Sequence, residues 1–252
     1  MSLGAPLLFA LLAALLSGCV AGLTGFGFSL VCAPLLLFSY GPETVVVLTA
    51  VLSVFVSADV VRDSWREAEW RLAAALLAPA LAGSVAGAWV LRAAETEYLE
   101  LAVGTVVALS ALVLLRDARI PGARTGWATV LAGSASGALS TSTGLAGPPV
   151  VLLLASRGVP KRPFRATGAL YFLAAGAVAF AVLALAVLAL GGSVDGGVLP
   201  LAAALVPAAV AGKAMGASFV GRLSERAFRA ASLATVALTG ALGVATALRA
   251  LV

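Results

Sequence analysis

Long apolar runs alternate with short polar loops along the whole chain. Two apolar stretches, 3–40 and 127–156, are interrupted by Gly, Pro, Ser and Thr. Six runs of 18 to 25 residues are continuous: 44–61, 72–91, 97–115, 166–190, 198–221 and 230–248. A helix needs about 20 apolar residues to cross a bilayer. The pattern therefore predicts an all-α polytopic membrane protein whose helices are embedded in lipid.

Composition agrees with the pattern and excludes several functions. The chain is 62% hydrophobic and 11% charged, whereas soluble domains have about 25% charged residues. Its net charge of +5 comes from basic residues in short loops, without the aromatic-rich basic patch of a nucleic-acid binder. The absence of His removes a His triad, a His metal site and a His proton relay. We expect no enzyme activity, no metal and no cofactor.

Both cysteines, Cys19 and Cys32, lie in the first broken stretch, and we expect them to serve packing. The segment 16–19 resembles a lipoprotein cleavage box, but no Lys or Arg precedes it. Because secretion signals begin with a basic region, we expect residues 3–22 to belong to the mature fold.

The two halves of the chain resemble each other in the order of their glycines and prolines. A shift of 115 places Gly18, Gly22, Leu30 and Pro34 on Gly133, Gly137, Leu145 and Pro149. A shift of 129 later places Gly83 and Gly87 on Gly212 and Gly216. The order predicts an internal duplication. Pairs of small residues four apart let helix backbones approach closely in lipid, so we expect these glycines to serve packing.

Loop charges predict how the chain crosses the membrane. If every apolar stretch crossed once, the fifteen loop Lys and Arg would divide seven to eight. If 3–40 and 127–156 each return to the side they came from, thirteen positives lie on one side. The positive-inside rule favours the second arrangement, with both termini outside a bacterial cytoplasmic (inner) membrane.

This topology makes the halves inverted repeats, as in many secondary transporters. Each repeat is a broken or re-entrant helical hairpin followed by three transmembrane helices. Repeat one, 1–120, contains the hairpin 3–40 and the spans 44–61, 72–91 and 97–115. Repeat two, 121–252, contains the hairpin 127–156 and the spans 166–190, 198–221 and 230–248.

The two breaks are the candidate binding site. Irregular backbone cannot face lipid, so it must be buried in protein or line a wet cavity. Half-helices that begin at a break direct N–H groups and a positive dipole end toward it, and hydroxyl groups add donors. The alternative is that such breaks serve only tight packing, with hydroxyls bonded to their own helix. The candidate substrate-binding residues are Thr24, Gly25, Phe26, Gly27, Ser29, Ser140, Thr141, Ser142, Thr143 and Gly144.

Charged residues inside spans are further candidates. Lys213 lies within 198–221, where it either offsets the substrate's charge or extends to the nearby membrane surface. Asp59 lies near the end of 44–61, and we expect it to pair with Arg62 rather than to carry protons.

The glycine-rich motifs resemble those of the sulfite exporter TauE/SafE family. The first runs from Gly18 through Gly22-Leu23-Thr24-Gly25-Phe26-Gly27 to Pro34, and the second from Gly133 through Thr143-Gly144-Leu145-Ala146-Gly147 to Pro149. The resemblance extends over nearly the whole chain. It implies a permease for sulfite, organosulfonates or related small anions, driven by an ion gradient. Residues 140–143 replace the usual glycine-rich second motif with hydroxyl residues.

We therefore expect a secondary transporter that moves a small anion by alternating access. A passive anion channel and a transporter of carboxylates or other organic anions remain alternatives. Expected partners are the anionic substrate, the lipid bilayer, a coupling proton or sodium ion, and a second copy of the chain in a homo-oligomer.

Overall fold

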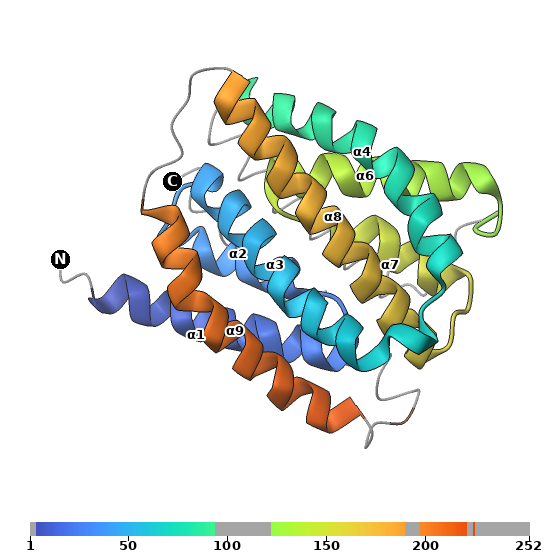
Figure 1. The fold of residues 1–252 in the computed structure, drawn as a ribbon, viewed down its shortest axis with the longest axis horizontal. Coiled ribbons are helices and arrows are strands. Elements are labelled where there is room, and N and C mark those ends of the chain that lie inside the picture. The colour runs from blue at the N-terminus through green and yellow to red at the C-terminus, as the bar shows by residue number, and fades with distance from the viewer. Residues whose placement is uncertain (1–3, 94–121, 190–196, 221–223, 225–252) are drawn as a thin grey trace, which may run out of the picture.

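A computed structural model describes residues 4–93, 122–189, 197–220 and 224, and these residues fold entirely into helices and their connections (Figure 1). The prediction of an all-helical protein is confirmed for this part of the chain. The helices are α1 (Gly4–Thr24), α2 (Phe28–Leu36), α3 (Pro42–Ser64), η1 (Trp65–Glu67), α4 (Trp70–Ala93), α6 (Gly126–Thr143), α7 (Gly147–Ser156), α8 (Lys161–Ala189) and α9 (Val198–Val220).

Among the described residues, five helices are long and apolar enough to cross a membrane: Pro6–Thr24, Glu43–Glu67, Trp70–Ala93, Lys161–Leu185 and Val198–Val220. The last four contain the predicted spans 44–61, 72–91, 166–190 and 198–221, apart from a few terminal residues. The predicted spans 97–115 and 230–248 lie outside the described residues.

The outer surface is apolar. Trp89 is 77% exposed, and Leu185, Val85 and Leu8 are each about 60% exposed. Large apolar patches on a soluble protein would drive aggregation, whereas the same side chains match the hydrocarbon of a bilayer. The molecule is therefore a multi-pass membrane protein.

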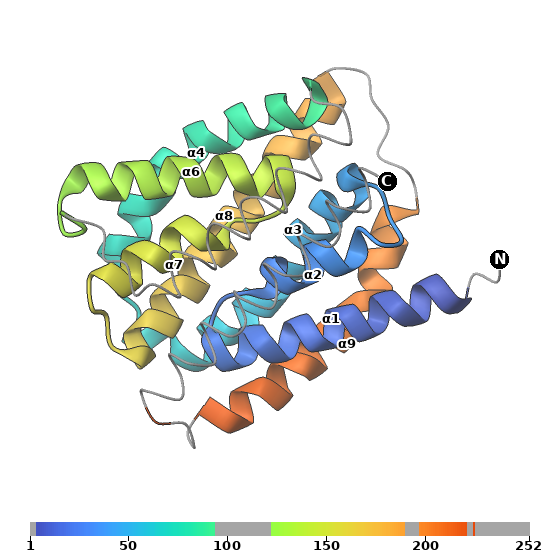
Figure 2. The ribbon, with the colours of Figure 1, turned by 180° about the vertical axis from the view of Figure 1, so that it is seen from behind.

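Each predicted broken stretch is a long helix, a short break and a short helix. The backbone adopts positive φ at Gly25 (79°) and Gly27 (90°) in the first break, and at Gly144 (76°) in the second. Glycine suits these positions because a side chain would be strained there. Figure 2 shows that α2 and α7 each double back beside the long helix before them, from opposite ends of the molecule.

Arg157 closes the second hairpin. Its Nε donates to the carbonyl oxygen of Ala123 at 2.7 Å, and its Nη2 donates to Thr129 Oγ1 at 2.6 Å. The start of α6 and the end of α7 therefore lie at the same end of the molecule.

We call the end formed by 62–71 and 157–165 the basic end. The two segments lie together there, since the Glu69 N–H donates to Thr167 Oγ1 at 2.9 Å and Arg162 lies 3.8 Å from Glu67.

Two close helix crossings flank the centre of the fold, α1 against α9 and α4 against α6 (Figure 1). A Cβ atom on Gly18 would collide with the carbonyl group of Ala209, and one on Gly212 with that of Leu15. The same contact recurs at the positions that the duplication pairs with these. A Cβ on Gly133 would collide with Leu76, and one on Gly83 with Ser134. The packing role expected for Gly83 and Gly212 is confirmed.

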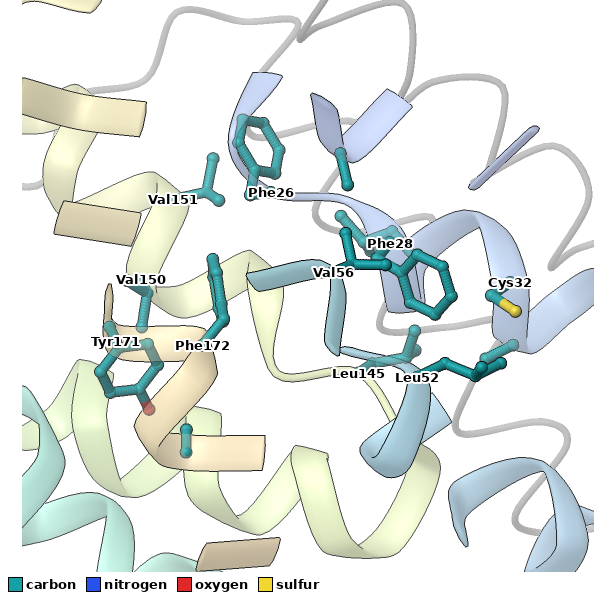
Figure 3. Packing of buried hydrophobic residues seen from close by; sticks show 14 of the residues in the cluster. Phe26, Phe28, Cys32, Leu52, Val56, Leu145, Val150, Val151, Tyr171 and Phe172 are labelled. Carbon is teal, nitrogen blue, oxygen red and sulfur yellow. The ribbon is translucent and has the colours of Figure 1, made fainter. Parts of the chain in front are cut away.

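Helices α2, α3, α7 and α8 fill the space between the crossings and contribute most of the large side chains of the core. Figure 3 shows Phe28, Leu52 and Leu145 at one side of this cluster and Tyr171 with Val150 at the other. Cys32 is buried here as a free thiol, which agrees with a packing role.

Candidate functional site

A cavity lies where the two helix breaks meet. Its volume is about 30 Å³. A single water needs about 10–15 Å³, so the cavity has room for a few waters or a small ion. Its walls come from both breaks, α3 and α8, through Gly27, Phe28, Ser29, Leu30, Ala50, Ser53, Ser57, Ser140, Gly144, Ala146, Gly147, Phe172 and Gly176.

The cavity lies halfway along the two central helices. Ser53 is the middle residue of α3, and Phe172 and Gly176 flank the middle of α8. Both helices are long enough to span a bilayer, so their midpoints lie far from water on either side.

Three serine hydroxyls in the cavity wall are available to a ligand. Within the described ranges, Ser29, Ser57 and Ser140 make no side-chain hydrogen bond to the protein, whereas Ser53 Oγ donates to the carbonyl oxygen of Ala50 at 2.9 Å. An unbonded hydroxyl at membrane depth needs a partner, which water or a ligand supplies.

The short helix α2 adds backbone donors. Its first intrahelical bond is made by the Val31 N–H to the carbonyl oxygen of Gly27 at 3.1 Å, and no side chain caps it. The N–H groups of Phe28, Ser29 and Leu30 therefore have no acceptor within their own helix. All three residues line the cavity, where the positive end of the helix dipole favours an anion.

The short helix α7 offers fewer backbone N–H donors to the cavity than α2 does. It begins Gly147-Pro148-Pro149, and proline has no N–H. The dipole of α7 also starts at the cavity, but only Gly147 in its first three positions has an N–H to donate. The expectation of free donors at both breaks therefore applies mainly to the first.

Among the described residues that line the cavity, none carries an ionised side chain. A cation would find no carboxylate there, whereas an anion would find hydroxyl groups and positive helix ends. The chemistry of the wall thus suits a small oxyanion that accepts several hydrogen bonds.

Four of the residues predicted from sequence line this cavity: Gly27, Ser29, Ser140 and Gly144. Sequence reasoning missed Ser53 and Ser57, which lie on α3 one turn apart and face the cavity together. Their spacing within the run 44–61 was the available signal, because residues four apart share a helix face.

The other predicted hydroxyls bond to the protein. Thr24 Oγ1 lies 2.5 Å from the carbonyl oxygen of Phe26 and accepts from the Phe26 N–H, so it shapes the first turn. Thr141 Oγ1 donates to the Ser84 carbonyl at 2.7 Å, which ties α6 to α4. Ser142 and Thr143 donate to the carbonyls of Ala138 and Leu139 in their own helix. None of the four lines the cavity.

Gly25 and Phe26 pack against the start of α8. A Cβ on Gly25 would lie 2.6 Å from the Cα of Arg165, and the Phe26 ring is 5.8 Å from that of Phe164. Neither residue lines the cavity.

Lys213 also lies away from the cavity. It is 3% exposed, and its Nζ is 2.7 Å from Asp59 Oδ2 and 2.6 Å from Asp63 Oδ2. Asp59 therefore pairs with Lys213, not with Arg62 as expected. The ion pairs link α9 to α3.

Comparison with curated proteins and with solved structures gives no match. A family model described as Sulfite exporter TauE/SafE matches residues 10–242. This match includes both helix breaks and every described residue that lines the cavity. The chain belongs to the sulfite exporter TauE/SafE family, whose members are membrane transporters and not enzymes.

Proposed function

We propose that this protein is a secondary transporter that carries sulfite or a small organosulfonate across the cytoplasmic membrane by alternating access. The anion rests in the cavity between the two breaks. The observation that carries the proposal is the composition of that cavity. Its described lining combines unbonded serine hydroxyls and two helix N-termini, with no ionised group among those residues.

The oxyanion class follows from the donors. Sulfite and sulfonates each present three oxygens on one sulfur, and the hydroxyls of Ser29, Ser57 and Ser140 approach the cavity from three different helices. The backbone N–H groups at the start of α2 supply further donors. A wall without a fixed positive charge binds the anion weakly enough to release it on the other side.

The proposed topology has both termini outside, with the basic end in the cytoplasm. Support comes from the hairpin α6–α7, which begins and ends at the basic end. The hairpin α1–α2 opens toward the opposite end (Figure 2). Hairpins that enter from opposite faces are what an inverted duplication produces.

Alternating access then has a structural basis in two tightly packed helix pairs. The glycine contacts hold α1 to α9 and α4 to α6 at backbone distance. Each pair joins one helix from each proposed repeat. We propose that the pairs move as rigid units around the cavity and open it first to one face and then to the other.

The test is transport by the purified protein in proteoliposomes. Sulfite, an alkanesulfonate and a carboxylate of similar size are offered with and without a proton or sodium gradient. We expect saturable flux of sulfite or the sulfonate that an ion gradient accelerates. Flux that responds to no ion gradient beyond its electrical component would instead identify a passive channel, and preference for the carboxylate would refute the substrate class.

A further inference from the structure

Arg165 has an unusual position for a cationic side chain. It lies four residues into α8, and its Nε donates to the carbonyl oxygen of Gly22 at 3.2 Å. Its Nη2 is buried and has no hydrogen-bond partner among the described residues. Buried polar atoms in proteins normally have at least one hydrogen-bond partner, so a buried donor without one is a place where a ligand is expected.

No carboxylate neutralises Arg165 directly. The acidic groups whose charges act on Arg165 are Asp63 and Glu67. The Asp63 carboxylate is held by Lys213 at 2.6 Å, and Glu67 faces Arg162 at 3.8 Å. Within the described part of the chain, Arg165 makes no salt bridge of its own.

Arg165 lies on the same helix as part of the cavity wall. Phe172, which lines the cavity, follows it on α8 by seven residues. Seven residues are two turns, so the two side chains project from the same helix face about 10 Å apart along the axis. Gly25 packs on the backbone of Arg165, and Gly27 in the same break lines the cavity.

We propose that Arg165 forms a second anion site at the basic end, where the transported oxyanion binds two helical turns from the cavity. The inference rests on the proposed function and adds a step to it. The free N–H groups of the guanidinium bind the anion's oxygens as it leaves water. The anion then exchanges this charged partner for the neutral donors of the cavity, two helical turns deeper.

The two sites together offset the cost of moving the anion out of water. At the basic end, a fixed positive charge compensates the loss of hydration, because a bare anion is costly to bury. In the cavity, helix dipoles and hydroxyls hold the anion without a permanent charge. A site at only one end predicts that the two faces of the membrane respond differently to its removal.

The experiment compares wild type with Arg165→Gln and Arg165→Lys in right-side-out and inside-out membrane vesicles. We expect Arg165→Gln to raise the KM for sulfite at least fivefold when the anion is offered to the face that carries the basic end. The KM from the opposite face should stay within twofold of wild type. Arg165→Lys keeps the charge but loses the planar donor array, so we expect a smaller rise on the same face.

The control is Arg162→Gln, which removes an exposed arginine from the same helix turn. We expect its KM to match wild type on both faces. An unchanged KM in Arg165→Gln, or an equal rise on both faces, would overturn the second site. If Arg165→Gln fails to fold, the same comparison in Arg165→Lys decides. Absence of sulfite and sulfonate transport by wild type would instead refute the proposed function, so the two failures are distinguishable.

Discussion

At the scale of single residues, the serines divide according to whether their hydroxyl is already bonded. Ser140 and Ser142 are two positions apart in the sequence, and both are buried. Ser142 donates to its own helix at 2.7 Å, whereas Ser140 faces the cavity with its hydroxyl unbonded. The helical turn places two chemically identical residues in different environments, so burial and residue type alone do not identify a binding residue.

Replacing Ser140 by Ala should weaken substrate binding. A hydrogen bond to a charged group contributes about 1.5 kcal/mol or more, so we expect the KM for the transported anion to rise roughly tenfold. Transport kinetics in proteoliposomes measure this. Ser218→Ala is the matched control, because Ser218 is exposed on α9 and bonds to the carbonyl of Met215 in its own helix. A larger rise for Ser142→Ala than for Ser140→Ala would contradict the assignment.

Lys213 should matter for stability more than for substrate affinity. Lys213→Met leaves Asp59 and Asp63 without their cation near the end of a membrane helix. Because both carboxylates are partly exposed, we expect a loss of about 1–3 kcal/mol rather than the 3–5 kcal/mol of a fully buried pair. Thermal unfolding in detergent measures the loss. Adding Asp59→Asn and Asp63→Asn should restore part of it, and an unchanged melting temperature in Lys213→Met would refute the role.

At the scale of helices, the glycine crossings decide how closely α1 approaches α9. A side chain at Gly212 would collide with the backbone of Leu15, which cannot move aside without separating the helices. The crossing is thus set by the absence of a Cβ atom, and apolar surface alone would not bring these helices so close in lipid.

Gly212→Val should therefore separate α1 from α9 and destabilise the protein by about 3 kcal/mol or more, as overpacking does when neither side can yield. Unfolding of the purified variant in detergent gives the value. Gly126→Ala is the control, because a Cβ there meets nothing within 4 Å and glycine is a poor helix former. We expect Gly126→Ala to be neutral or slightly stabilising. Equal melting temperatures for Gly212→Val and wild type would contradict the close crossing.

At the scale of the whole molecule, the same kind of glycine contact occurs in both halves of the chain. Gly18 and Gly133 are paired by the 115-residue shift, and each packs on a helix from the other half of the chain. In both crossings a helix of the first half packs against a helix of the second half, so neither half forms a crossing by itself. Each half therefore contributes one long helix to each glycine crossing and one break to the cavity.

The topology can be tested by labelling. Single cysteines at Ser39, near the end of α2, and at Arg66, at the basic end, are introduced into a variant in which Cys19 and Cys32 are Ser or Ala. We expect an impermeant thiol reagent to label position 39 from outside intact cells and position 66 only after the membrane is opened. Labelling of both positions from the same side would refute the proposed crossing pattern.

Local spacing in the sequence was sufficient to predict the long apolar helices that the structure describes, the two breaks and the close contacts of Gly83 and Gly212. It could not predict which hydroxyls face the cavity. Ser57 lies in an apolar run without any motif, and the partner of Lys213, Asp63, is 150 residues away. Side-chain direction near a break depends on how the helices around it pack, so Thr141 and Ser142 looked equivalent to Ser140 until the packing of α6 on α4 distinguished them.

The most direct measurement locates a heavy analogue of the anion. Selenite has the shape and charge of sulfite, and selenium scatters X-rays anomalously. In crystals of the protein grown with selenite, we predict an anomalous peak in the cavity within hydrogen-bond distance of Ser29 and Ser140. Bound selenite outside both the cavity and the Arg165 site, or an empty cavity in protein that transports selenite, would contradict the account.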